Sequence, residues 1–338
     1  MERIATATLH TEMLSYQGKV VLAPMVRVGT LPMRLLALEY GADLVWSPEI
    51  VDKKIIGSER IFNARLGTYD YIKDGRTLVF RTHPRERERL VLQLGSADAE
   101  LALQAAQTVA RDVAGIDLNC GCPKHFSIHA GMGAALLRNG ERLTSILRRL
   151  VQGLPEMSIS AKIRLLPDKA ESLELIRTIL ATGIRALTVH CRTPEERPRQ
   201  PAHHEWLPEV VEMSPIPIIV NGDVFGREDI QRIRDLSRAS SVMIARGAQW
   251  NASIFRREGM LDPRQVTQTY LGYALATDNP FSNTKYTVLQ MWLDRPYTER
   301  RLVVALQRVR AAASTAGRRG GCSRAVRRSR PGPCRRPS

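Results

Sequence analysis

The stretch from Asp117 to Lys124 contains the residues of this 338-residue chain whose types and spacing point most clearly to chemistry. It reads Asp-Leu-Asn-Cys-Gly-Cys-Pro-Lys and begins at the end of an apolar run. A buried strand that stops here would deliver an Asn, two Cys and a Lys into a turn, where side chains stay accessible. A thiol in such a turn can act as a nucleophile, a metal ligand or a proton donor. Cys122, which stands between a Gly and a Pro, is therefore the candidate reactive group.

A zinc site is the competing interpretation of the same stretch. Cys120, Cys122, His125 and His129 are all potential ligands, but the CxxC spacing of zinc knuckles is absent and all four would crowd into ten residues. We therefore expect no metal site, and we expect Cys120 to be a buried, inert thiol.

Cations and glycines stand at the ends of several other apolar runs. Lys162 and Arg164 are two residues apart in a strand-like run, so both should point to one face, where an anionic ligand would compensate their charge. His190 ends the next run and could donate a hydrogen bond to a ring carbonyl. Gly222 and Gly247 end the last two runs, where barrels commonly build a phosphate site, and Arg246 adds a cation there.

Eight β-branched, continuously apolar runs are spaced regularly along the chain, as is typical of parallel strands covered on both faces. Segments with apolar residues at helical spacing separate most of them. This alternation predicts an α/β protein with a (β/α)8 TIM barrel; a doubly wound sheet is disfavoured because no GxGxxG follows the first run. The expected strands are Val20–Met25, Leu44–Ile50, Leu90–Gly95, Gly115–Cys120, Ile159–Leu165, Ala186–Arg192, Ile216–Asp223 and Ser241–Gly247. The expected helices are Leu31–Tyr40, Ala97–Val109, Glu141–Val151, Ser172–Ala181 and Arg227–Leu236.

The order of these patterns predicts the domain organisation. We expect an N-terminal extension (1–18), the barrel as catalytic domain (19–252), a small all-helical domain (253–310) and a disordered Arg-rich tail (311–338). No apolar run is long enough to span a membrane, and five Cys without framework spacing suit a reducing compartment. We therefore expect a cytoplasmic protein, with the nucleus or the mitochondrion as alternatives.

The net charge of +16 is concentrated at one end of the chain. Residues 300–338 contain twelve Arg and no acid, which leaves +4 for all the preceding residues. A basic surplus favours a polyanionic partner, because each phosphate contact releases counterions. The alternative is a solvated tail that binds nothing specific.

Seven short motifs stand out: Leu22-Ala23-Pro24-Met25-Val26, Asn119-x-Gly-Cys122-Pro123, Gly131-Met132-Gly133-Ala134-Ala135-Leu136-Leu137, Lys162-Ile163-Arg164, Val189-His190-x-Arg192, Asn221-Gly222-Asp223 and Ala245-Arg246-Gly247. Taken together, these motifs resemble the tRNA-dihydrouridine synthase family. Residues 23–38 look most like the eukaryotic branch that acts on position 20 of tRNA. Two residues depart from the pattern, because His129 stands where relatives have Lys and Cys120 stands where a larger apolar residue is common.

The resemblance implies an FMN enzyme that uses NADPH or NADH to reduce a uridine of tRNA to 5,6-dihydrouridine. The target uridine would be flipped into the site, and Cys122 would give a proton to C5 of its ring. An unactivated thiol, with a pKa of about 8.5, is protonated at neutral pH and suits that role. The matching cofactor positions are Pro24, Met25, Val26, Gln93, Lys162, His190, Asn221, Gly222, Asp223, Ala245 and Arg246, and the matching substrate positions are Asn119, Lys162, Arg164 and Arg192.

We further expect a monomer that binds tRNA, with no membrane partner and no structural metal. Two other functions remain open from the sequence. One is an FMN barrel that reduces a small molecule, as a dihydroorotate dehydrogenase does. The other is a non-catalytic RNA-binding barrel.

Overall fold

The computed structural model describes residues 13–292. The predicted tail, most of the predicted N-terminal extension and residues 293–310 of the predicted helical domain lie outside the described residues. The chain divides into a compact unit from Met1 to Met291 and a second unit that begins at Trp292. The description below concerns the first unit.

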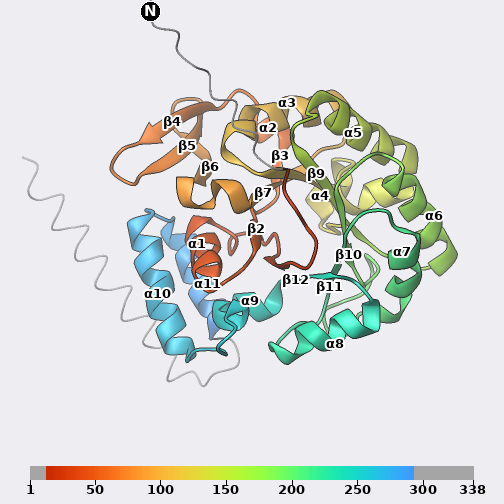
Figure 1. Ribbon diagram of the computed structural model, residues 1–338. Coiled ribbons are helices and arrows are strands. Elements are labelled where there is room, and N and C mark those ends of the chain that lie inside the picture. The colour runs from red at the N-terminus through yellow and green to blue at the C-terminus, as the bar shows by residue number, and fades with distance from the viewer. Residues whose placement is uncertain (1–12, 293–338) are drawn as a thin grey trace, which may run out of the picture. The chain divides into compact units, whose positions relative to one another are not determined.

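Eight parallel strands close into a barrel, as predicted (Figure 1). Around the barrel the strands follow chain order, and the last pairs with the first through the register of Val20 with Val242. The strands are β1 (Val20–Leu22), β2 (Leu44–Trp46), β7 (Leu90–Gly95), β8 (Gly115–Cys120), β9 (Ser158–Arg164), β10 (Ala186–His190), β11 (Ile218–Asn221) and β12 (Ser241–Ile244).

Helices surround the strands and cover their outer face (Figure 1). Asp98 and Asp168 cap two of them by accepting the backbone N–H groups of Leu101 and Glu171, as helix starts prefer. The five predicted helices are confirmed to within three residues at each end. The helices of the barrel are α1 (Leu31–Glu39), α3 (Ala99–Val109), α5 (Gly140–Gly153), α6 (Lys169–Leu180), α7 (Leu207–Met213), α8 (Glu228–Ser237) and α9 (Arg246–Trp250).

The interior of the barrel is a packed core. Trp46, Val91, Ile219 and Met243 are fully buried in one cluster, and the ring of Tyr16 lies 6.2 Å from that of Trp46. Burying each large side chain contributes about 1.5–3 kcal/mol. The strands are therefore rigid supports for whatever stands at their ends.

Several predicted strands are too long at their C-terminal ends. The first stops at Leu22 instead of Met25, and the seventh stops at Asn221 instead of Asp223. Pro24 has no N–H to continue the ladder, and Asp223 adopts a left-handed backbone with φ of 48°. The residues lost from the strands form the turns that follow them. We call the ends of the eight strands and these turns the barrel mouth.

An insert that the sequence pattern did not reveal lies between β2 and β7. Strand β3 (Ile50–Val51) pairs with the end of β7, and α2 (Asp52–Ile55) follows it. A three-stranded antiparallel sheet comes next, followed by a short 3-10 helix at 84–89. The strands of that sheet are β4 (Glu59–Asn63), β5 (Thr68–Lys73) and β6 (Thr77–Thr82).

Two helices follow the barrel in the described part of 253–310. They are α10 (Pro263–Ala276), which packs on α1, and α11 (Phe281–Met291), which packs on α9. The domain boundaries given above stay predictions. Within residues 13–292, no helix has the length and apolar character needed to cross a membrane.

Candidate active site

The turn after β8 holds Cys122 at the barrel mouth. The side-chain oxygen of Asn119 accepts the backbone N–H groups of Gly121 at 3.0 Å and Cys122 at 3.1 Å. Gly121 lies against Arg164, since a Cβ added there would stand 3.2 Å from Arg164 Cγ. Asn119, predicted to contact the substrate, therefore also shapes the turn that carries the thiol.

The two cysteines of this turn have different environments. Cys122 is half-buried, whereas Cys120 is fully buried. Burial raises the pKa of the Cys122 thiol, and the backbone N–H of Lys124 and the hydroxyl of Ser127 oppose that rise. Because the net direction is upward, Cys122 is protonated at neutral pH. It is the accessible thiol of the pair and can give a proton.

Two cations of β9 and a histidine of the neighbouring strand β10 lie beside this turn. Strand pairing places Arg164 of β9 directly across from His190 of β10. Burial and the nearby Arg164 guanidinium lower the pKa of Lys162 to about 8. Burial, Lys162 and Arg164 hold the pKa of His190 well below its ordinary value, so its imidazole is neutral. The barrel mouth thus combines closely spaced positive charges with a neutral ring.

A buried carboxylate below the mouth is a site residue that the sequence analysis missed. Asp117 accepts hydrogen bonds from Gln93 Nε2 at 2.9 Å and Ser160 Oγ at 2.8 Å. Burial raises its pKa to about 6, and the charge of Lys162 opposes that rise. The bond to Asp117 orients the Gln93 amide, which was predicted to contact the cofactor. The sequence did contain a signal for this site residue, because Asp117 is an acidic residue within an otherwise apolar run.

The turns after β11 and β10 are joined by ion pairs. The Asp223 carboxylate accepts Arg192 at 2.5 and 2.6 Å and Arg246 at 2.7 Å. The side chain of Arg192 is 3% exposed and is held by Asp223, and its predicted contact with the substrate stays a prediction. Arg246 is half-buried and also lies over the ring of Phe225. Arg246, the cation predicted at the phosphate site, is thus already paired with the Asp223 carboxylate.

Both glycines predicted to make room for a phosphate are required by protein packing. A Cβ at Gly222 would stand 2.8 Å from Ala202 Cβ, and the φ of Gly222 is 141°. A Cβ at Gly247 would overlap the carbonyl oxygen of Val224. The tight fit of these loops on one another accounts for the glycines without a ligand, and their role in phosphate binding stays a prediction.

The remaining predicted positions also lie at the mouth. Asn221 donates to the Met243 carbonyl at 2.8 Å, which joins the ends of β11 and β12. Pro24, Met25 and Ala245 are partly buried in the turns after β1 and β12, and Val26 is 62% exposed. The closed barrel thus brings the sequence-predicted residues to one end, from seven different strands or the turns after them.

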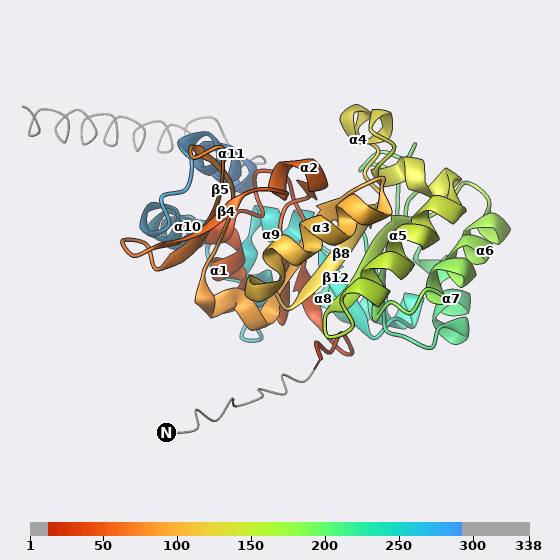
Figure 2. The ribbon, with the colours of Figure 1, turned by 90° about the horizontal axis from the view of Figure 1, so that it is seen from above.

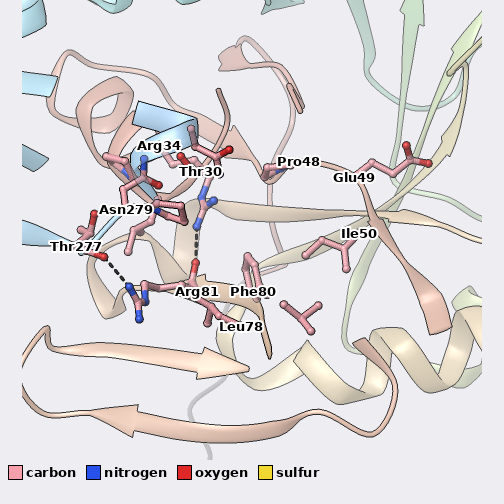
Figure 3. Close-up of a pocket in the computed structure, with 15 residues that line it drawn as sticks. Thr30, Arg34, Pro48, Glu49, Ile50, Leu78, Phe80, Arg81, Thr277 and Asn279 are labelled. Atoms are coloured by element: carbon pink, nitrogen blue, oxygen red, sulfur yellow. Dashed lines mark hydrogen bonds between the residues drawn. The ribbon is translucent and has the colours of Figure 1, made fainter. Parts of the chain in front are cut away.

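Two hollows lie between this end of the barrel and the insert. The smaller, of about 200 Å³, is bounded by Thr277 and Asn279 on one side and by Glu49 and Ile50 on the other (Figure 3). The larger, of about 600 Å³, shares Glu49 and Ile50 with it. We call the larger hollow the lysine groove, and its lining consists of Val26, Glu49, Ile50, Val51, Lys53, Lys54, Lys73, Asp74, Thr77, Leu78, Val79 and Phe126.

Helices α2 and α4 (His125–His129) frame the lysine groove. Each follows the C-terminal end of a strand, and both rise from the same side of the barrel (Figure 2). Phe126 of α4 is 52% exposed, and Lys53 and Lys54 of α2 are exposed. Lys73 is held beside them because its ammonium donates to the carbonyls of Lys53 and Ile56. Cations and an aromatic ring on one accessible surface suit a nucleic acid.

No group of three or more His, Cys, Asp and Glu side chains is placed to hold a metal ion within the described part of the chain. The thiols of Cys120, Cys122 and Cys191 are free.

The sequence profile of one protein family matches residues 21–277, which include the barrel, except for the first residue of β1, and its mouth. The chain belongs to the dihydrouridine synthase (Dus) family. Relatives of the Dus chain include the protein named tRNA-dihydrouridine(20) synthase [NAD(P)+] in Schizosaccharomyces pombe, which is 52% identical over 82% of this chain. The Saccharomyces cerevisiae protein of the same name is 45% identical over 81% of this chain.

The Dus chain spans 60% of the length of the S. pombe relative and 77% of the S. cerevisiae one. Its fold is also similar to that of histamine dehydrogenase from Rhizobium sp. 4-9, with a TM-score of 0.50, 9% identity, and coverage of 77% of this chain and 48% of that one. That likeness concerns the fold alone.

Proposed function

We propose that this Dus protein reduces a uridine at position 20 of tRNA to 5,6-dihydrouridine, using FMN and NADPH or NADH. Family membership supports the reaction, and the names of the two yeast relatives support the position and the nicotinamide. The observation that carries the proposal is the half-buried, protonated Cys122 thiol beside the cations of the barrel mouth.

The residues of the mouth fit a flavin. Lys162 and Arg164 place two positive charges near the single buried carboxylate of Asp117, so an anionic ligand would compensate the remaining charge. Arg164 donates to the carbonyl of Thr193 at 2.8 Å, which holds a second cation close by. When bound, FMN would accept reducing equivalents from the nicotinamide and pass them to C6 of the uracil ring.

The chain itself would supply the proton and the orientation. Cys122 would give its proton to C5 of the uracil, since a group that is protonated at neutral pH can act as a general acid. Asn119 would hold the Cys122 turn in place through its two backbone hydrogen bonds. Gln93, held by Asp117, would present its amide oxygen to the cofactor.

The lysine groove supports tRNA as the substrate. Three lysines line it against two acids, and burial raises the pKa of one of these acids, Glu49. A groove of about 600 Å³ has room for nucleotides beside the flipped base. Lysines would contact phosphates, and Phe126 would stack on a base. The monomeric state and the cytoplasmic location stay predictions from the sequence.

The Cys122→Ala variant tests the proposed reaction. It should fold, bind FMN, accept electrons from NADPH and bind tRNA, because the strands and the cations are untouched. Dihydrouridine, measured by mass spectrometry of digested tRNA, should fall about 10²- to 10⁴-fold, which is the usual cost of losing a general acid.

Cys120→Ala is the matched control, because it removes the neighbouring buried thiol. It should keep most of the product yield. Near-normal yield with Cys122→Ala would overturn the assignment of the acid, and so would a larger loss with Cys120→Ala. Reoxidation of the reduced flavin by free pyrimidines but not by tRNA would overturn the assignment of tRNA as the substrate.

A further inference from the structure

One buried hydroxyl, that of Ser127, lies beside the active-site thiol. The side chain of Ser127 is 0% exposed, and its Oγ makes no hydrogen bond of ordinary distance and angle with any described residue. Nearly all buried polar groups in folded proteins are hydrogen-bonded, and leaving one unpaired costs about 1–3 kcal/mol. An unpaired hydroxyl that persists here therefore points to a partner that forms only during function.

Ser127 and Cys122 border the same small space. A Cβ added at Gly133 would overlap Ser127 Oγ and would lie 3.1 Å from Cys122 Cβ, and Gly133 has a φ of 59°. The segment around Gly133 ties the two residues together, because Met132 N–H donates to the Ser127 carbonyl and Ala134 N–H to the Cys122 carbonyl. Only a residue without a side chain fits between them.

The hydroxyl already lies close enough to the thiol to act on it as a weak hydrogen-bond donor. Burial raises the pKa of Cys122, and Ser127 is one of the groups that oppose this rise. A donor beside a sulfur stabilises the thiolate more than the thiol, because hydrogen bonds to charged acceptors are the stronger ones. Its effect should grow where little water reaches the site.

We propose that Ser127 is a positioning residue whose hydroxyl donates a hydrogen bond to Cys122 Sγ when that sulfur has lost its proton. The proposal rests on the proposed function. In the proton-transfer step the S–H bond of Cys122 breaks, a C–H bond forms at C5 of the uracil, and the sulfur keeps the electron pair as a thiolate. Ser127 keeps its own proton throughout and lowers the cost of the buried negative charge.

The Ser127→Ala variant of the flavin-loaded enzyme tests this directly. Iodoacetamide alkylates thiolates, so the alkylation rate of the peptide that contains Cys122, followed by mass spectrometry against pH, reports the ionisation of that thiol. The midpoint should move up by about one pH unit, which is a tenfold change in the ionisation constant. Single-turnover formation of dihydrouridine should slow about tenfold, while reduction of the flavin by NADPH keeps its rate.

Ser237→Ala is the matched control. Ser237 is also a fully buried serine, but it ends α8 and donates to the Ile233 carbonyl. Its loss should leave the alkylation midpoint of Cys122 in place, and a thermal melt checks that both variants are folded.

An unchanged midpoint in Ser127→Ala overturns the proposal, as does a slower turnover without any shift in the pH profile. If the wild-type protein makes no dihydrouridine, the proposed reaction is wrong, whatever the alkylation profile shows. The alkylation profile tests the contact between Ser127 and Cys122 without reference to turnover, so the two failures are distinguishable.

Discussion

At the scale of single residues, burial shifts the pKa values of the Cys122 thiol and the Lys162 ammonium in opposite directions. Burial disfavours the charged form of any group, so it raises the pKa of Cys122 and lowers that of Lys162 to about 8. The thiol therefore keeps its proton at neutral pH, whereas the ammonium is close to losing its own. The site can hold a proton donor and an anion-binding cation together.

The pKa of Lys162 predicts how cofactor binding depends on pH. Lys162 is charged below about pH 8 and neutral above it, so the affinity of the apoprotein for FMN should be highest below pH 8. Above pH 8 the affinity should fall as the charge is lost, by up to about tenfold per pH unit. Quenching of flavin fluorescence on titration between pH 6.5 and 10 measures this.

Two variants separate Lys162 from other groups that titrate in the same range. Lys162→Met should bind FMN more weakly and show no inflection near pH 8. Lys169→Met removes an ammonium that is partly exposed and paired with Glu209 on the outer helices, and it should keep the inflection. The same inflection in Lys162→Met would contradict the prediction.

At the scale of secondary-structure elements, the insert between β2 and β7 is anchored to the barrel by one buried ion pair and by one partly exposed ion pair. Arg34 of α1 donates two hydrogen bonds of 2.8 Å to Glu86, and both side chains are almost fully buried. Arg60 of β4 and Tyr71 of β5 both donate to Asp112. Removing one partner of the buried Arg34–Glu86 pair should cost about 3–5 kcal/mol, and the contacts to Asp112 support the same position of the insert. That position places Lys73 in the lysine groove.

The lysine groove predicts a change in the salt dependence of tRNA binding. The double variant Lys53→Glu, Lys54→Glu removes two exposed cations of α2. The slope of log Kd against log salt should become shallower by about one to two units, because fewer phosphates are neutralised. Filter binding at several salt concentrations measures the slope.

A control with the same change in net charge is available on other faces of the barrel. Arg148 lies on the outer helix α5, and Arg185 precedes β10 at the end opposite the mouth; both are exposed. The variant Arg148→Glu, Arg185→Glu should leave most of the slope in place. Equal changes of the salt slope in the two double variants would mean that the slope depends only on the net charge and that the lysine groove does not bind RNA.

At the scale of the whole molecule, positive charge is distributed very unevenly. Residues 300–338 carry twelve of the fifty basic residues and none of the thirty-four acids. Long-range attraction to a polyanion depends on such a surplus and is screened by salt. The C-terminal residues should therefore contribute affinity that does not depend on the RNA sequence.

Deletion of residues 318–338 tests this contribution. It removes eight Arg and no acid. Binding to tRNA and to an unrelated RNA of equal length should weaken by similar factors, with a shallower salt slope for both. Flavin content and reduction by NADPH should stay the same. An unchanged slope would show that these residues do not contact RNA.

The sequence by itself determined the barrel and the residues at its mouth. Apolar runs such as 90–95 and 115–120 mark strands through local composition, and the strands found there have those bounds. In a closed parallel barrel every strand ends at the same side, so Arg164 and His190 had to meet once their strands were recognised. The tRNA-dihydrouridine synthase motifs in the sequence likewise identified the family.

Only the tertiary structure decided which partners these side chains take. Asp223 joins Arg192, 31 residues away, and Arg34 joins Glu86, 52 residues away. Hydrophobic periodicity reports neighbours within a few residues, and it holds no information on contacts between side chains so far apart in the chain. The unpaired hydroxyl of Ser127 beside Cys122 depends in the same way on the fold, because a turn six residues further on closes the space between them.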